Sequence, residues 1–327
     1  MTSMRFAFHL LLLGTATAAF LPSGMSRQRA LLPRRCDQLQ LCDAGVQVEE
    51  PEDAELEAFL SEPHPRIPVE DLSVIVGDSE RNAAQLEAVT LQRVSEVLAE
   101  HGVVVLRQVW KSDAAVVDAL VSIIHANYEA CSTLLREREI DPDEDSYGFK
   151  QIIHRSHGRF DMQMGESVAP VPLLDSLADA VFGDWHRQVL EKLLGADYRV
   201  NFIAALYAAA GCADQEPHAD GGHLFHSTHG TEVHTPVHAL QVFMPMCDMD
   251  AERGPTEFWP GSHLVGNTRF ADMMPSLVLE AKPGDAILFD FRVVHRGTAN
   301  KNRKGLWRPI LYQTCSRSWF FVSAQRT

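Results

Sequence analysis

Residues 282–300 read K-P-G-D-A-I-L-F-D-F-R-V-V-H-R-G-T-A-N, and this stretch joins a turn, a strand and a histidine. The P-G-D triplet at 283–285 is turn chemistry. The apolar run 286–291 is short enough to be one buried strand. His295 follows that strand and precedes the R-G-T segment at 296–298. We therefore expect a polar functional site close to the end of a buried strand.

Further strand-like segments lie on both sides of this stretch in the C-terminal half. Turn signals such as the P-G-S triplet at 260–262 separate them. They cover residues 198–208, 239–246, 277–281, 286–291 and 308–314.

The N-terminal half shows helical spacing of apolar residues instead. The expected helices cover residues 82–100, 112–139 and 177–194, with one β-branched strand at 103–107. Helices first and then many short strands predict an α+β fold, or a barrel with helical flanks.

The start of the chain has the features of a targeting sequence. Residues 1–19 combine an early arginine, an apolar core and small residues, as signal peptides do. Residues 20–48 resemble a transit segment, and the two together resemble the bipartite plastid presequence of algae with complex plastids. The alternatives are the secretory pathway and an N-terminus without a targeting role. We expect residues 49–80 to be an acidic linker and residues 81–323 to be a single domain.

Composition and charge exclude several classes of protein. Hydrophobic residues make up 46% of the 327 residues and charged residues 22%, as in soluble globular proteins. The apolar core of the leader is too short for stable membrane insertion. The formal net charge of −15 disfavours sequence-independent binding to nucleic acid, because the phosphates repel such a protein. We expect a small-molecule substrate. The sequence does not indicate an oligomeric state.

The H-A-D triplet at 218–220 is the first candidate for metal binding. In an extended segment His218 and Asp220 point to the same side, so both could bind one ion. With His295 they would supply two imidazoles and one carboxylate, as in non-haem Fe(II) oxygenases that keep positions open for cosubstrate and O₂. A zinc hydrolase could use the same ligand types, so the ligands alone leave the metal open.

Arg308 lies thirteen residues after His295 and begins a strand. A guanidinium offers a planar fork of donors for a carboxylate, such as the distal carboxylate of a 2-oxoglutarate cosubstrate. Thr298 precedes Arg308 by ten residues and could donate its hydroxyl to the same carboxylate.

Five stretches together resemble phytanoyl-CoA dioxygenase-type Fe(II)/2-oxoglutarate oxygenases. They are G-V-V-V-L-R-Q-V-W (102–110), Q-E-P-H-A-D-G-G-H-L-F (215–225), G-P-T-E-F-W-P-G-S-H (254–263), residues 282–300 quoted above, and R-P-I-L-Y (308–312). The resemblance implies a double-stranded β-helix, which is a jelly roll or cupin-like barrel, with flanking helices. It also implies Fe(II), 2-oxoglutarate and O₂ as cofactor and cosubstrates, with hydroxylation of an organic metabolite and release of succinate and CO₂.

The resemblance also implies roles for individual residues. His218, Asp220 and His295 would bind the iron and be the catalytic centre, while Arg308 and Thr298 would hold the distal carboxylate of 2-oxoglutarate. Retention of a carboxylate at position 220 disfavours halogenation.

Other polar residues are weaker candidates. Gln241 could line the cosubstrate pocket, although core packing explains it equally well. Contact with substrate is one possible role for three residues: His223, Lys150 and Arg159. The simpler interpretation is that they are ordinary polar or surface residues. The alternative functions are a jelly-roll enzyme that does not use 2-oxoglutarate, such as a zinc hydrolase or isomerase, and a non-catalytic ligand-binding barrel.

Overall fold

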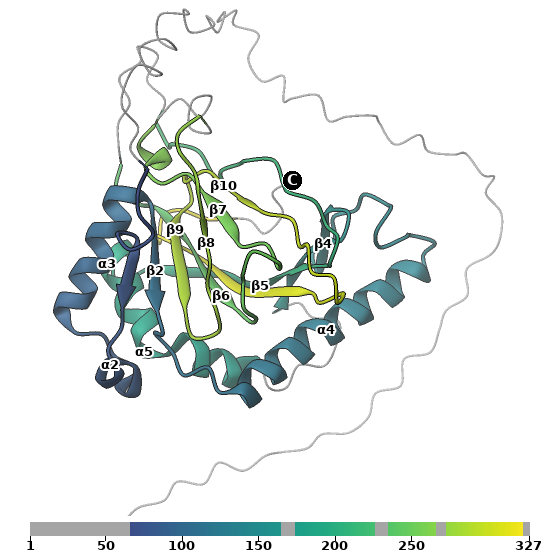
Figure 1. The fold of residues 1–327 in the computed structure, drawn as a ribbon, viewed down its shortest axis with the longest axis horizontal. Helices are drawn as coiled ribbons and strands as arrows, with labels where there is room; N and C mark the ends of the chain where they lie inside the picture. Colours follow the sequence, from purple (N-terminus) through teal and green to yellow (C-terminus); the bar gives the residue numbers. More distant parts are fainter. Residues whose placement is uncertain (1–65, 165–173, 226–234, 266–272, 323–327) are drawn as a thin grey trace, which may run out of the picture. The chain divides into compact units, whose positions relative to one another are not determined.

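The computed structural model describes residues 66–164, 174–225, 235–265 and 273–322. Helices precede most of the strands, as the sequence predicts (Figure 1). The helices are α2 (Asp78–Ala83), α3 (Ala88–His101), α4 (Ala114–Arg136) and α5 (Leu174–Leu194), and a short 3₁₀ turn, η2, covers Ser262–Leu264. The predicted signal peptide and transit segment lie outside the described residues.

Eight strands form the larger of two sheets, in the order β1-β2-β9-β6-β11-β5-β4-β3. Only the β1–β2 pair is parallel. The strands are β1 (Ser73–Ile75), β2 (Val103–Arg107), β3 (Ile152–Ser156), β4 (Arg159–Gln163), β5 (Arg199–Ala208), β6 (Ala239–Pro245), β9 (Ala286–Asp290) and β11 (Arg308–Ser316).

A second sheet contains three antiparallel strands in the order β10-β7-β8. These are β7 (Thr256–Phe258), β8 (Leu277–Leu279) and β10 (His295–Gly297). Phe258 of this sheet packs edge to face on Phe289 of the larger sheet, with ring centroids 5.1 Å apart. The α+β class and the double-stranded β-helix with flanking helices are therefore confirmed.

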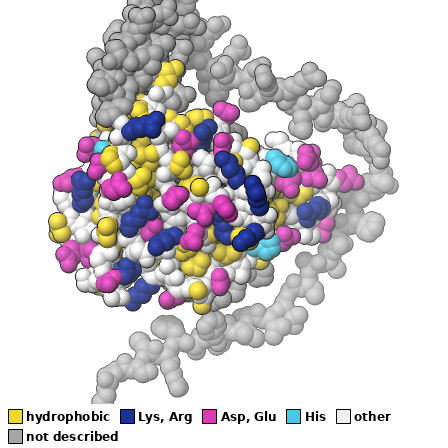
Figure 2. All heavy atoms as spheres, viewed as in Figure 1, with side chains coloured by type: hydrophobic (Ala, Val, Ile, Leu, Met, Phe, Trp, Pro, Cys, Tyr) yellow, Lys and Arg dark blue, Asp and Glu magenta, His cyan; other side chains and the backbone are white. Residues whose placement is uncertain are grey.

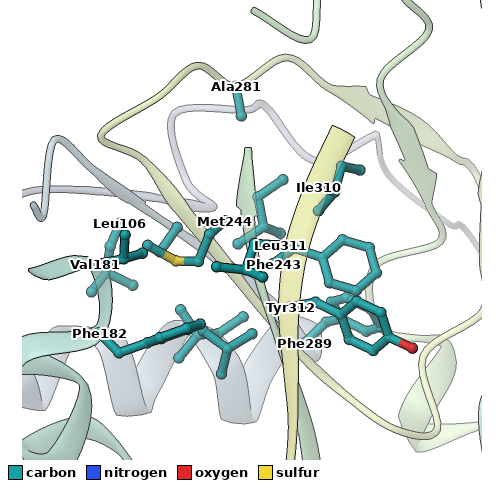
Figure 3. Packing of buried hydrophobic residues seen from close by; sticks show 14 of the residues in the cluster. Leu106, Val181, Phe182, Phe243, Met244, Ala281, Phe289, Ile310, Leu311 and Tyr312 are labelled. Atoms are coloured by element: carbon teal, nitrogen blue, oxygen red, sulfur yellow. The ribbon is translucent and has the colours of Figure 1, made fainter. Parts of the chain in front are cut away.

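The apolar core continues from the strands into the helices. Helix α5 contributes Val181 and Phe182, which lie beside Leu106 and Met244 of the large sheet (Figure 3). Helix α3 ends at Gly102 in the left-handed region with φ +74°, and its N–H donates to the carbonyl of Leu98. A side chain at Gly102 would also collide with His263 and Val293. The turn from α3 into β2 therefore requires glycine.

The edge of the large sheet extends into the segment that we expected to be an acidic linker. Residues 73–75 form β1, and Val74 is buried against the core. The physical reason is that apolar residues alternate at Leu72, Val74 and Val76, and each is buried. The described part of the chain contains no helix long and apolar enough to cross a membrane. Acidic and basic side chains intermingle on the face shown in Figure 2.

Candidate metal centre

His218, Asp220 and His295 meet at one point between the two sheets. One ligand atom from each lies within 4.8 Å of the others. The Nε2 atom of His295 is 3.9 Å from Oδ2 of Asp220. His295 is buried, Asp220 is half-buried and His218 is exposed, so one side of the site faces solvent. The fold thus brings the three predicted ligands together, so that two imidazoles and one carboxylate can bind one metal ion from the same side.

A backbone bridge fixes the two histidines next to each other. The N–H of His218 donates to the carbonyl of His295 at 3.0 Å, and the N–H of His295 donates back at 2.8 Å. The segment before Asp220 therefore pairs with β10 although it lies outside the named strands. Residues paired directly across antiparallel strands have neighbouring side chains, so both imidazoles face the same ion.

Hydrogen bonds also fix which nitrogen of each imidazole is available to a metal. The Nδ1 atoms of His218 and His295 lie 2.9 and 3.0 Å from the carbonyl oxygens of Glu216 and Val293. A carbonyl can only accept, so Nδ1 carries the proton and the Nε2 lone pair remains free for the ion. Burial lowers the pKa of His295, which favours the neutral, metal-binding form of the ring.

Asp220 is held by a chain of two side-chain hydrogen bonds. The amide nitrogen of Gln241 donates to Oδ2 of Asp220 at 2.8 Å, and the hydroxyl of Thr314 donates to the amide oxygen of Gln241 at 2.7 Å. Gln241 was predicted to line the cosubstrate pocket. The structure places it in the cavity wall but directs its amide at the metal ligand.

Arg308 begins β11 and is only 3% exposed. Its Nη1 donates to the carbonyl oxygens of Gly254 and Thr298, the latter at 3.0 Å. Its Nε has no hydrogen-bond partner, and no carboxylate pairs with it among the residues the structure describes. Burial and the neighbouring cation Arg159 lower the pKa of Arg308 to about 10. A buried cation without a counter-charge calls for an anionic ligand.

Thr298 connects to Arg308 through its backbone rather than through its hydroxyl. The hydroxyl donates to the carbonyl of Pro255 at 2.6 Å, and the Thr298 carbonyl accepts from Arg308. Since His295 faces the cavity, the alternation along β10 directs residue 298 away from it. Thr256, which pairs with Gly297 on β7, is a hydroxyl residue that does line the cavity, and the sequence reasoning missed it.

The three candidate metal ligands and Arg308 line one cavity of about 650 Å³. Its apolar wall includes Phe202, Leu206 and Phe291. A polar cluster forms another part of the wall, because the buried Tyr312 hydroxyl and the exposed Arg155 side chain both donate to the buried Asp161, at 2.8 and 2.7 Å. Burial, followed by the Asp161 charge, raises the pKa of Tyr312 far above its usual value.

Three residues were predicted as weak substrate contacts, and they have different positions. Arg159 lines the cavity, but next to Arg308. Lys150 is exposed and His223 is buried, and neither is among the described residues that line the cavity. The structure therefore groups only Arg159 with the rest of the site.

The family comparison agrees with this geometry. Residues 98–310 match the family model described as phytanoyl-CoA dioxygenase (PhyH). Among solved structures, the chain resembles the epimerase SnoN in complex with Fe³⁺, alpha ketoglutarate and nogalamycin RO, with 20% identity and a TM-score of 0.48 over 71% of this chain and 85% of that one. It also resembles SnoK, a non-heme alpha ketoglutarate dependent carbocyclase from nogalamycin biosynthesis (18% identity, TM-score 0.47, 72% and 85% coverage). A third resemblance is to the apoform of EctD from S. alaskensis (18% identity, TM-score 0.45, 71% and 77% coverage).

Proposed function

The chain belongs to the phytanoyl-CoA dioxygenase family of Fe(II)- and 2-oxoglutarate-dependent enzymes, and from that premise we propose that it hydroxylates a small or medium-sized organic metabolite. Succinate and CO₂ would be released with each turnover. One observation carries the proposal: the group formed by His218, Asp220 and His295 lines the same cavity as the buried Arg308, which forms no ion pair in the described part of the chain.

Each group has a defined task in this proposal. Iron held by only three protein ligands keeps positions open at which a 2-oxo acid and O₂ bind together. His218, Asp220 and His295 hold the ion, and Gln241 orients the carboxylate of Asp220. Arg308 receives the distal carboxylate of 2-oxoglutarate and so sets the direction in which the diacid lies.

The cavity wall supports an organic substrate of modest size. Phe202, Leu206 and Phe291 supply apolar surface, while Arg155 and Asp161 add polar groups that can orient a ligand. A few polar groups in an apolar wall are typical of small-molecule sites. A zinc hydrolase would give Arg308 a partner only if its substrate carried an anionic group, whereas 2-oxoglutarate supplies a carboxylate in every turnover.

Succinate formation tests the proposal without knowledge of the substrate. Purified protein supplied with Fe(II), 2-oxoglutarate and O₂ should release succinate slowly, and faster when a metabolite pool contains its substrate. Asp220→Ala should abolish release, whereas Asp184→Ala, an exposed carboxylate on α5, should not change it. Iron-loaded, folded protein that forms no succinate under any of these conditions would refute the proposal.

A further inference from the structure

Two buried arginines lie in one row across the large sheet. Arg159 of β4 pairs with Ala208 of β5, and Ala208 pairs with Arg308 of β11. Residues in one row point to the same face of a sheet, and strands two apart are separated by about 10 Å. The small side chain of Ala208 leaves room for both long side chains above it. The strand register thus places two guanidinium groups over the same part of the cavity.

The tips of both arginines converge on Gly297. A Cβ atom on Gly297 would lie 2.5 Å from Nη1 of Arg159 and 3.2 Å from Nη2 of Arg308. Gly297 lies two residues from His295 on β10, so it faces the same side at a distance of about 7 Å. The absence of a side chain at Gly297 therefore lets both guanidinium tips, together with Oε1 of Gln215, lie against the backbone of β10 beside the metal site.

Neither cation forms an ion pair with a carboxylate among the described residues, although the charge of Asp214 in the same cavity wall opposes the lowering of the Arg159 pKa. Arg159 is 5% exposed, and its Nε and Nη2 atoms donate to the backbone carbonyls of Ala213, Gly297 and Thr298. These bonds orient the side chain and leave Nη1 on the Gly297 side. Burial lowers the pKa of Arg159. Two like charges buried side by side are costly unless an anion lies between them.

We propose that Arg159 is a second cation of the cosubstrate site, which holds the distal carboxylate of 2-oxoglutarate together with Arg308. Arg159 is then a specificity-determining residue that selects dicarboxylate over monocarboxylate 2-oxo acids. A carboxylate has enough acceptor positions for two guanidinium groups, and each charge-assisted bond is stronger than a neutral one. The inference rests on the proposed function and replaces the role of substrate contact that the sequence indicated for Arg159.

The test compares two 2-oxo acids that differ in the distal carboxylate. Dissociation constants for 2-oxoglutarate and 2-oxopentanoate are measured anaerobically on Fe(II)-loaded wild type, Arg159→Met and Arg159→Lys. We expect Arg159→Met to weaken 2-oxoglutarate binding about 10- to 100-fold and to leave 2-oxopentanoate binding unchanged. Arg159→Lys keeps the charge without the fork and should fall between.

Arg317→Met is the matched control. Arg317 also donates to two backbone carbonyls, those of Val237 and Leu193, and does not line the cavity among the described residues. Its loss should leave the affinities for both acids unchanged, which separates the loss of carbonyl bonds from the loss of the cation. Thermal unfolding of each variant shows whether the fold persists, and Arg159→Lys provides the comparison if Arg159→Met does not fold.

The possible results separate the two proposals. Equal weakening of both acids in the Arg159 variants would reduce Arg159 to a structural role and overturn the inference. Unchanged 2-oxoglutarate binding in those variants would also overturn it, while the proposed function stands. Wild type that binds neither acid would refute the proposed function, and the inference with it.

Discussion

Gln241→Leu should weaken iron binding although Gln241 does not touch the ion. The substitution removes the 2.8 Å hydrogen bond to Oδ2 of Asp220 and leaves the carboxylate free to rotate. A hydrogen bond to a charged group contributes about 1.5–3 kcal/mol, and loss of a partner that orients a metal ligand costs about 10- to 100-fold in affinity. The two ranges agree, because a factor of ten corresponds to about 1.4 kcal/mol. We therefore expect a dissociation constant for Fe(II) about 10 to 100 times that of wild type.

The assay is an anaerobic titration in which the protein competes with a chromogenic chelator for Fe(II). Gln241→Leu also strands the Thr314 hydroxyl, which costs about 1–3 kcal/mol of folding stability. Thr314→Val in the same chain should recover much of that stability without restoring iron affinity, since it removes the stranded hydroxyl only. The double variant thus separates loss of stability from loss of metal binding.

Gln313→Leu is the control for this experiment. Gln313 is a buried glutamine on β11, next to Thr314, and alternation along the strand directs it to the opposite face of the sheet. Its substitution should leave iron affinity as in wild type. A folded Gln241→Leu protein with wild-type iron affinity, or an equal loss in Gln313→Leu, would refute the reasoning.

Three further predictions follow from other parts of the structure. Burial holds the pKa of His186 at about 3 in the folded protein, below its usual value of 6.5. As the pH falls below about 6.5, the histidine therefore takes up a proton in the unfolded chain but not in the folded one, and the free energy of unfolding decreases. Chemical denaturation at pH 7.0 and 5.5 should show that His186→Leu removes about 1.3 kcal/mol of the wild-type difference; an unchanged difference contradicts the assignment. Thr256→Val should weaken 2-oxoglutarate binding about two- to tenfold in an anaerobic titration, because Thr256 faces the cavity opposite Gly297; equal affinity would exclude its hydroxyl from the site. Residues 1–48 fused to a fluorescent protein should direct it to the plastid of an alga with a complex plastid. Secretion of the fusion would instead favour the secretory pathway as the destination.

The meeting of His218, Asp220 and His295 could be predicted because its signal is local. His218 and Asp220 are two residues apart in an extended segment, and His295 follows a buried strand that begins after a recognisable turn. The place of Arg308 in the candidate site could be predicted for a similar reason, since a charged residue at the start of an apolar strand is unusual unless it binds a ligand. These features depend on spacing along the chain, which the sequence displays directly.

The contacts that depend on strand register could not be predicted. Arg159 meets Arg308 only because both pair with Ala208, and residues 159 and 308 are far apart in sequence. Strand β4 itself was missed, although the polar residues Arg159 and Asp161 alternate with apolar ones, because five residues are a short stretch on which to recognise a strand. Thr298 was placed with the carboxylate by its spacing from Arg308 and by the family resemblance, whereas its hydroxyl donates to the carbonyl of Pro255.

The boundary between α2 and α3 also could not be predicted from the sequence, because it depends on a tertiary contact. Apolar spacing predicted one helix over residues 82–100, but α2 ends at Ala83 and α3 begins at Ala88. Ala84 adopts the left-handed region with φ +51°, which ends the first helix. Tertiary contacts select this break, since the Gln188 side chain accepts the N–H of Leu86 at 2.8 Å. Local propensity gives no sign of a partner one hundred residues away.

The most direct test of the account is anaerobic visible absorption of the protein with Fe(II) and 2-oxoglutarate. A 2-oxo acid chelated to Fe(II) gives a weak charge-transfer band that free iron and free acid lack. We expect this band in wild type, its loss in Asp220→Ala, and a higher 2-oxoglutarate concentration for half-maximal intensity in Arg308→Met. Absence of the band from folded, iron-loaded protein, or a band indifferent to Asp220 and Arg308, would contradict the assignment of metal centre and cosubstrate site to this cavity.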